Sequence, residues 1–257
     1  VSTEIPFGIS MIATVLENAG HDVELLVITP DTPLDEYVKN NVITKNPSLF
    51  CFTAVSTQYW QAKKVAKYVR EIDPSIFLVL GGHHSSLNSD DVIKDNVFDA
   101  ICVGEGEDVM KDFVDAVMQK KSFDGIDNLW IRKETGDGTE IIKNEVRKLE
   151  NDLDLIPNPD RDLYRKEAFF SQEKPYELFE ASRGCPFDCS FCFIHQFRDM
   201  YRRKGKGLRL RTPQLVVDDI KDTHQKYGIK QVMFVDSTFN LNKKWLVEFC
   251  ELFAEQT

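Results

Sequence analysis

The chain has 257 residues, a length typical of one or two domains. Hydrophobic residues make up 42% of it, enough for a substantial core, and the composition excludes a disordered or collagen-like protein. The net charge of −10 disfavours binding to nucleic acid, and no apolar run approaches the roughly 18 residues of a membrane span. Because no secretory signal is visible, we expect a cytoplasmic protein with no nucleic-acid partner and no membrane span.

Helix and strand patterns alternate along the first half of the chain. Helical spacing covers residues 8–19, 34–40, 59–72, 90–94 and 107–119, and strand-like apolar runs cover residues 23–28, 49–55, 76–80 and 99–103. Near-continuous apolar strands between helices predict a parallel sheet covered on both faces. We therefore expect an α/β fold that begins with a Rossmann-like doubly wound domain. Since such a domain normally opens with a strand, its first strand is expected to precede Val1.

The second half shows a hairpin, a linker and a second domain. Gly136-Asp137-Gly138 predicts the hairpin turn. The proline-containing stretch 149–161 is predicted to be a linker packed on the surface. Strands are predicted at residues 177–181 and 231–236, and helices at residues 213–228 and 243–255, the first of them capped by Thr212 and Gly228. We expect three parts: a domain at residues 1–125, the hairpin and linker at 126–170, and a second domain at 171–257.

Three of the six cysteines lie in one short loop with the spacing Cys-x3-Cys-x2-Cys, at Cys185, Cys189 and Cys192. Three thiolates can bind three irons of a cubic iron–sulfur cluster, which leaves the fourth iron open to a substrate. The alternative is a structural zinc site with His195 as fourth ligand, although zinc sites usually separate two ligand pairs by a longer segment. The remaining cysteines lie in apolar stretches and are expected to be inert core thiols: Cys51, Cys102 and Cys250.

Two glycine-rich turns follow predicted parallel strands, Gly81-Gly82-His83 and Gly104-Glu105-Gly106. Glycine at the carboxyl edge of a sheet lets a ligand approach the backbone closely. Neither turn is a dinucleotide-binding fingerprint, and a tight turn between strand and helix would explain either one alone.

The cysteine loop closely resembles that of the radical S-adenosylmethionine (SAM) enzymes, in its three cysteines and in the aromatic Phe191 just before the last of them. The resemblance implies a [4Fe–4S] cluster whose open iron chelates SAM, and reductive cleavage of SAM to methionine and a 5′-deoxyadenosyl radical. It also implies that Phe191 lies against the adenine and that Asp236 contacts the methionine moiety. The implied fold is the start of a shortened TIM-like (βα) barrel, of which two units are visible.

Five upstream stretches, in the same order, resemble the cobalamin-binding domain of one large radical SAM subfamily: Pro6–Gly8, Ala19–Val23, Thr53–Ser56, Gly81–His83 and Gly104–Glu107. The resemblance implies cobalamin bound near Ser56, Gly81, Gly82, His83, Gly104, Glu105 and Gly106. Methyl carriers of the methionine synthase type use an Asp-x-His-x-x-Gly motif, which this chain lacks. We therefore expect no histidine ligand to cobalt.

The subfamily implies two reactions: methylation of an unactivated carbon, which we favour, and oxidative ring closure. A non-catalytic cobalamin-binding module is the alternative, although such a module needs no open iron. The implied partners are a small-molecule substrate and a reductant such as flavodoxin or ferredoxin. The basic stretch 198–211 is either a solvated loop or a contact for an anionic substrate. Because a barrel needs more units than are visible, the chain is expected to be part of a longer protein.

Overall fold

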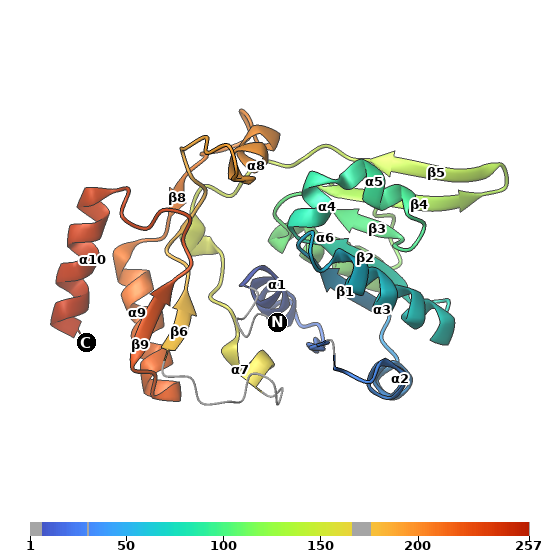
Figure 1. Ribbon diagram of the computed structural model, residues 1–257, viewed down its shortest axis with the longest axis horizontal. Helices are drawn as coiled ribbons and strands as arrows, with labels where there is room; N and C mark the ends of the chain where they lie inside the picture. The colour runs from blue at the N-terminus through green and yellow to red at the C-terminus, as the bar shows by residue number, and fades with distance from the viewer. Residues whose placement is uncertain (1–6, 30, 166–175, 257) are drawn as a thin grey trace. The chain divides into compact units, whose positions relative to one another are not determined.

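A computed structural model describes residues 7–29, 31–165 and 176–256. These residues form two compact units, each with strands and helices (Figure 1). The sheet unit comprises residues 19–21 and 26–147, and the cysteine unit comprises the described residues of 1–18, 22–25 and 148–257. Among the described helices, none is both long and apolar enough to cross a bilayer.

The sheet unit is built on one five-stranded sheet. Its elements are α2 (Leu34–Lys45), β1 (Leu49–Thr53), α3 (Tyr59–Ile72), β2 (Phe77–Gly81), α4 (His83–Leu87), α5 (Ser89–Lys94), β3 (Ala100–Cys102), α6 (Glu107–Met118), β4 (Leu129–Thr135) and β5 (Gly138–Lys143). The strands follow the order β1-β2-β3-β4-β5. The first two pairings are parallel, which confirms the predicted α/β alternation, and the last two are antiparallel. The predicted hairpin, β4–β5, continues the same sheet.

Strand β2 lies at the centre of the apolar core. Leu78, Val79 and Leu80 are each at most 1% exposed. Because successive side chains of a strand point to opposite faces, both faces of β2 are covered, as the sequence predicts. Phe77 of β2 contacts Phe113 of α6, with ring centroids 5.5 Å apart.

Two predictions about the first half of the chain are wrong. Residues 23–28, predicted to be a strand, have no regular secondary structure. A strand exists only where a neighbour completes its hydrogen bonds, and no described strand pairs with this segment. Strand β1 is only partly covered because it is at the edge of the described sheet. Cys51, which lies on it, is exposed instead of buried.

The cysteine unit contains a parallel βα unit and a short antiparallel pair. Its elements are α1 (Phe7–Asn18), the 3-10 helix η1 (Leu153–Leu155), α7 (Arg161–Arg165), β6 (Tyr176–Phe179), β7 (Ser182–Arg183), α8 (Ile194–Met200), β8 (Arg209–Leu210), α9 (Pro213–Tyr227), β9 (Gln231–Phe234) and α10 (Lys243–Gln256). Strands β6 and β9 are parallel, and β7 and β8 are antiparallel. This agrees with a beginning (βα) barrel.

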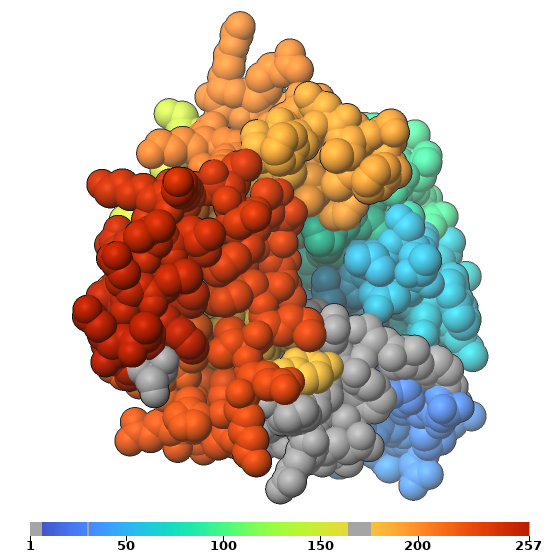
Figure 2. All heavy atoms as spheres, turned by 60° about the vertical axis from the view of Figure 1, so that its left-hand side comes forward, coloured from blue at the N-terminus to red at the C-terminus, as the bar shows by residue number. Residues whose placement is uncertain are grey.

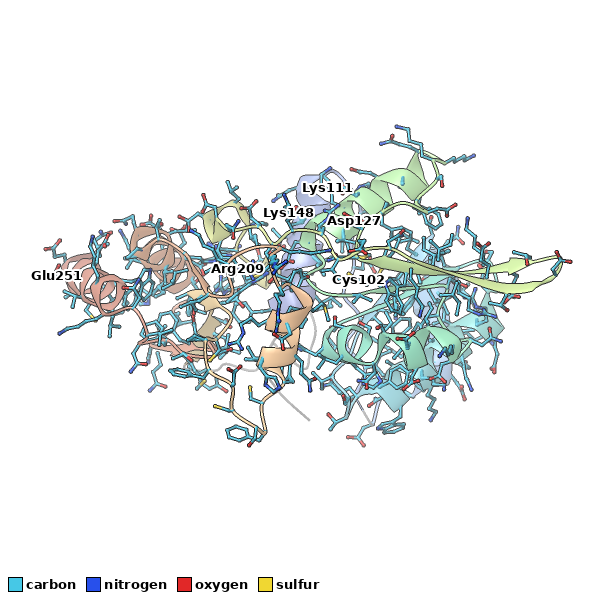
Figure 3. The ribbon with its side chains drawn as sticks, turned by 90° about the horizontal axis from the view of Figure 1, so that it is seen from above. Cys102, Lys111, Asp127, Lys148, Arg209 and Glu251 are labelled. Carbon is cyan, nitrogen blue, oxygen red and sulfur yellow. The ribbon has the colours of Figure 1, made fainter. Side chains whose placement is uncertain are left out.

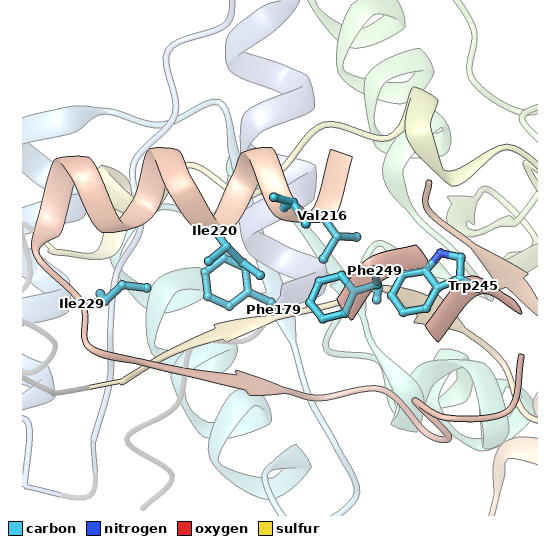
Figure 4. Close-up of a cluster of buried hydrophobic side chains, with 8 residues drawn as sticks. Phe179, Val216, Ile220, Ile229, Trp245 and Phe249 are labelled. Carbon is cyan, nitrogen blue, oxygen red and sulfur yellow. The ribbon is translucent and has the colours of Figure 1, made fainter. Parts of the chain in front are cut away.

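Helices α9 and α10 cover β6 through an aromatic core (Figure 4). Phe179 of β6 is 1% exposed, and the rings of Trp245 and Phe249 stack at 5.3 Å. The predicted ends of α9 are confirmed. The Thr212 hydroxyl accepts a hydrogen bond from the Leu215 N–H at its start. Cys250, on α10, is exposed, so the prediction of a core thiol is wrong there.

The predicted linker packs against α1. Met11 of α1 forms a small core with Leu153 and Ile156. The Asp160 N–H donates to the Thr14 hydroxyl at 2.7 Å. Residues 149–161 are therefore part of the cysteine unit.

Candidate cofactor sites

Ala181 and Ser182 lead from β6 into the cysteine loop and form its stem. A carboxylate at the end of the neighbouring strand holds this stem. Asp236 follows β9, and β9 is parallel to β6, so Asp236 lies beside the residues that follow β6. The Ala181 N–H donates to Asp236 Oδ2 at 3.1 Å, and the Ser182 hydroxyl donates to the other oxygen. Burial raises the pKa of Asp236 above its usual range. Both carboxylate oxygens therefore bind the stem of the loop.

Cys185 is buried and closely surrounded. Gly184 before it has φ +93°, and a Cβ there would collide with the Gly207 carbonyl, so only glycine fits. Cys185 Sγ lies 3.3 Å from the Thr238 hydroxyl, and Arg198 donates to the Cys185 carbonyl at 3.3 Å. Sequence reasoning did not find Thr238 or Gly184, because neither contact follows from the cysteine spacing.

The other two cysteines are more accessible. Cys189 is exposed and Cys192 is partly buried, and the Cys192 N–H donates to the Cys189 carbonyl at 3.0 Å. Phe191 between them is 91% exposed. This segment lies at the molecular surface (Figure 2, orange).

The chemistry of the donor set favours a cluster over a structural zinc ion, because the loop offers three thiolates and a structural zinc site takes four ligands. A zinc ion holds every ligand within about 2.3 Å, whereas a cubic cluster binds each thiolate at a different corner. His195, the alternative fourth zinc ligand, has a buried Nδ1 with no hydrogen-bond partner in the described part of the chain.

Three cations of the basic stretch after the loop make contacts within the chain. Arg198 pairs with Asp188, and Arg202 pairs with Asp199 at 3.0 Å. Arg209 is buried among other side chains and donates to a backbone carbonyl (Figure 3). Arg203 and Lys206 are exposed, and a contact of this stretch with an anionic substrate stays a prediction.

In the sheet unit, the Gly81-Gly82 turn packs directly on the end of β1. Gly82 has φ +95°, and a Cβ there would lie 2.7 Å from the Ala54 carbonyl oxygen. In the direction in which a side chain would point, Gly82 therefore packs against the chain itself. The approach of a ligand to the backbone of this turn stays a prediction. Gly81 makes only ordinary contacts.

Two serines of α4 connect the two glycine-rich turns. The Ser86 hydroxyl donates to the Gly82 carbonyl at 3.0 Å and accepts from the Gly104 N–H at 2.9 Å. The Ser85 hydroxyl bonds the carbonyls of Gly82 and Cys102. The sequence offered no sign of this link, because α4 was not predicted.

A polar cluster lies beside the Gly81-Gly82 turn. Ser56 Oγ is 3.0 Å from His84 Nδ1, and the Tyr59 ring lies over the His84 ring at 4.2 Å. Asn88 contacts the same His84 nitrogen at 3.3 Å. His84 belongs to helix α4, which the sequence did not predict, and it has these partners. His83, the first residue of α4, is exposed.

The second turn leads into α6. Gly104 has φ +101°, and Gly106 is the N-cap of α6. The Glu105 carbonyl accepts a hydrogen bond from the buried Asn128 side chain at 2.9 Å. The turn is therefore anchored to the start of the hairpin.

Two family models match the chain: the B12 binding domain over residues 1–114 and the radical SAM superfamily over residues 179–256. The chain belongs to the radical SAM proteins that carry a B12-binding domain. This confirms both resemblances predicted from the sequence.

Relatives of this B12-binding radical SAM chain include two enzyme types. It is 31% identical to an uncharacterized methyltransferase of Pyrococcus horikoshii over 252 residues, which covers 96% of this chain and 52% of that protein. It is 28% identical to an anaerobic magnesium-protoporphyrin IX monomethyl ester cyclase of Rubrivivax gelatinosus over 251 residues, covering 96% and 44%. The chain thus spans about half the length of the curated relatives it matches.

The same architecture occurs in a solved structure, the cobalamin-dependent SAM radical enzyme OxsB. The TM-score is 0.73 at 19% identity, over 96% of this chain and 34% of that one. At this identity the similarity establishes the α/β fold alone.

Proposed function

We propose that this chain is the cofactor-binding part of a cobalamin-dependent radical SAM enzyme that methylates an unactivated carbon. One observation carries the proposal. A loop with three cysteines, whose stem is fixed by Asp236, occurs in one chain with a B12-binding domain. A module that only binds cobalamin has no use for such a loop.

In this proposal Cys185, Cys189 and Cys192 bind three irons of a [4Fe–4S] cluster and leave the fourth iron to SAM. When bound, the reduced cluster supplies an electron for cleavage of SAM, and cobalamin supplies a methyl carrier. The exposed Phe191 ring is our candidate for stacking on the adenine. Asp236 is our candidate on the methionine side, with its position fixed by the bonds to the stem.

On the sheet unit, the cobalamin residues are those of the two turns and the adjoining cluster: Ser56, Gly81, Gly82, His83, Gly104, Glu105 and Gly106. We add His84 and Ser86 to this set, because they contact Ser56 and both turns. Neutral hydroxyl, imidazole and backbone groups can form hydrogen bonds with the amide side chains of the corrin ring of cobalamin. His84 Nδ1 contacts Ser56 and Asn88. The absence of a histidine ligand to cobalt stays a prediction.

Anaerobic reconstitution with iron and sulfide tests the cluster. We expect the parent protein to bind about four irons with matching sulfide. Cys185→Ala, Cys189→Ala and Cys192→Ala should each lose the iron–sulfur absorbance and the cleavage of SAM. Cys250→Ala, which removes an exposed thiol on α10, should retain both. Zinc in place of iron in the parent protein would contradict the proposal.

Oxidative ring closure is the second candidate, because the similarity to the ring-forming cyclase covers 96% of the chain. The two reactions differ in the fate of the methyl group of SAM. With SAM labelled in that methyl group, a methyltransferase passes the label to bound cobalamin. If the complete protein cleaves SAM and leaves all label in methionine, the cyclase is favoured.

The reaction implies a small-molecule substrate and a one-electron reductant such as flavodoxin or ferredoxin. We place the protein in the cytoplasm, where thiols stay reduced. All six cysteines are free, which supports this location.

A further inference from the structure

The Thr238 hydroxyl lies 3.3 Å from the Cys185 sulfur. Resting on the proposed function, we infer that Thr238 donates a hydrogen bond to the cluster through Cys185 and raises the reduction potential of the cluster. Thr238 is thus a positioning and tuning residue, which does not itself touch SAM or substrate.

The position of Thr238 is fixed from both sides. Two residues before it, Asp236 binds Ala181 and Ser182 of the stem. One residue after it, Phe239 stacks on Phe234 with ring centroids 4.2 Å apart and joins the aromatic core. The short segment between these anchors cannot move far, so the Thr238 hydroxyl stays next to the stem.

Cys185 is fixed as firmly as its partner. It is 9% exposed, its carbonyl is held by Arg198, and Gly184 packs on the Gly207 carbonyl. Cys189, by contrast, is exposed. The Cys185 sulfur thus lies beside a hydroxyl that follows a different strand, β9.

The direction of the hydrogen bond follows from the chemistry. The Thr238 hydroxyl also lies 2.7 Å from the Ser237 carbonyl, so its single proton has two acceptors within reach. A sulfur bound to iron carries no proton. In the protein with its cluster bound, the Thr238 hydroxyl is therefore the donor and the Cys185 sulfur the acceptor. Reduction adds negative charge to the cluster, and a donor to a ligating sulfur stabilises that charge. The hydroxyl therefore makes the cluster easier to reduce.

A redox titration of the reconstituted protein, followed by electron paramagnetic resonance of the reduced cluster, tests this inference. Thr238→Val keeps the shape but removes the donor, so its midpoint potential should shift to a more negative value at unchanged iron content. Thr238→Ser keeps a hydroxyl and should match the parent. Thr44→Val, which removes an exposed hydroxyl from helix α2, is the control and should also match the parent.

An unshifted midpoint potential in Thr238→Val overturns the inference and leaves the proposed function intact. A parent protein that binds no iron and sulfide overturns both. Should Thr238→Val fail to fold, Thr238→Ala replaces it. In addition, an iron–cysteine stretching band of the parent in resonance Raman spectra should shift in D₂O, and no shift contradicts the hydrogen bond.

Discussion

Asp236 shows how one side chain can have a role that its position in the sequence does not reveal. The family resemblance implies that Asp236, the last residue of a predicted strand, contacts the methionine moiety, and in the structure both of its oxygens bind the stem of the cysteine loop. The three cysteines could be found from their spacing alone. Asp236, Thr238 and Gly184 support them through contacts between strand ends, which depend on the sheet pairing and not on sequence distance.

The raised pKa of Asp236 predicts a pH effect on stability. Burial makes the folded protein bind a proton at this carboxyl more tightly than the unfolded chain does. This contribution is fully present below the unfolded pKa and is lost as the pH rises through the folded pKa. Relative to Asp236→Asn, the parent should therefore gain free energy of unfolding as the pH falls from neutral toward the range where the carboxyl protonates.

Urea unfolding of both proteins at a series of pH values measures this difference. Asp137→Asn, in the exposed hairpin turn, is the control for the charge change itself. The difference in free energy of unfolding between the parent and Asp236→Asn should grow in the acid range. If it stays constant with pH or shrinks there, the raised pKa of Asp236 is contradicted.

At the scale of elements, helix α9 was predictable because its ends are specified locally. Thr212 and Pro213 start it, and Gly228 ends it with φ +67°. Segment 23–28 has an equally clear apolar pattern, yet it forms no strand, because a strand depends on a partner elsewhere in the chain. Helix α4 was missed because it begins directly after the glycine turn and has no apolar periodicity. Local signals therefore predicted the ends of α9 well and strand pairing poorly, whereas α2 ends at Lys45, beyond the predicted residue 40.

The conformation of Gly228 predicts the cost of replacing it. No atom lies within 4 Å of a Cβ built there, so the cost comes from the positive φ alone. Gly228→Ala should lower the free energy of unfolding by about 1 kcal/mol, and Gly228→Asn by less, because asparagine tolerates this region.

Gly8 offers the opposite case, since it lies inside α1 and also has no atom within 4 Å of a Cβ built there. Gly8→Ala should raise the free energy of unfolding by about 0.5–1 kcal/mol. Urea denaturation measures all three variants. If Gly8→Ala and Gly228→Ala changed the free energy of unfolding equally, backbone conformation would not decide the effect of the substitution on stability.

At the scale of the whole molecule, the chain consists of two units with separate cores. The core of the sheet unit centres on β2, and that of the cysteine unit on Phe179 and the helices around it. Both proposed cofactor sets lie at carboxyl ends of parallel strands, where open α/β sheets usually bind ligands. The α/β class could be predicted from the alternating patterns, whereas the order of the strands could not.

Separate cores predict that the two cofactors can be lost independently. His84→Ala removes the contact with Ser56 and the stacking on Tyr59, so it should weaken cobalamin binding about three- to tenfold and leave the iron content unchanged. Cys185→Ala should lose iron and keep its cobalamin affinity. Equilibrium titration with cobalamin and iron analysis measure both. Loss of both cofactors in either variant would contradict independent binding.

The Ser86 hydroxyl has a thermodynamic consequence for the sheet unit. It bonds Gly82 at one turn and Gly104 at the next, so a displacement of either turn strains the same pair of hydrogen bonds. Ligand binding or a rearrangement at one turn is then thermodynamically coupled to a rearrangement at the other, and this coupling is reciprocal. If a ligand at the first turn changes the free energy of rearranging the second, a rearrangement of the second changes the affinity of that ligand by the same amount. A single serine thereby makes two neighbouring strand ends respond together.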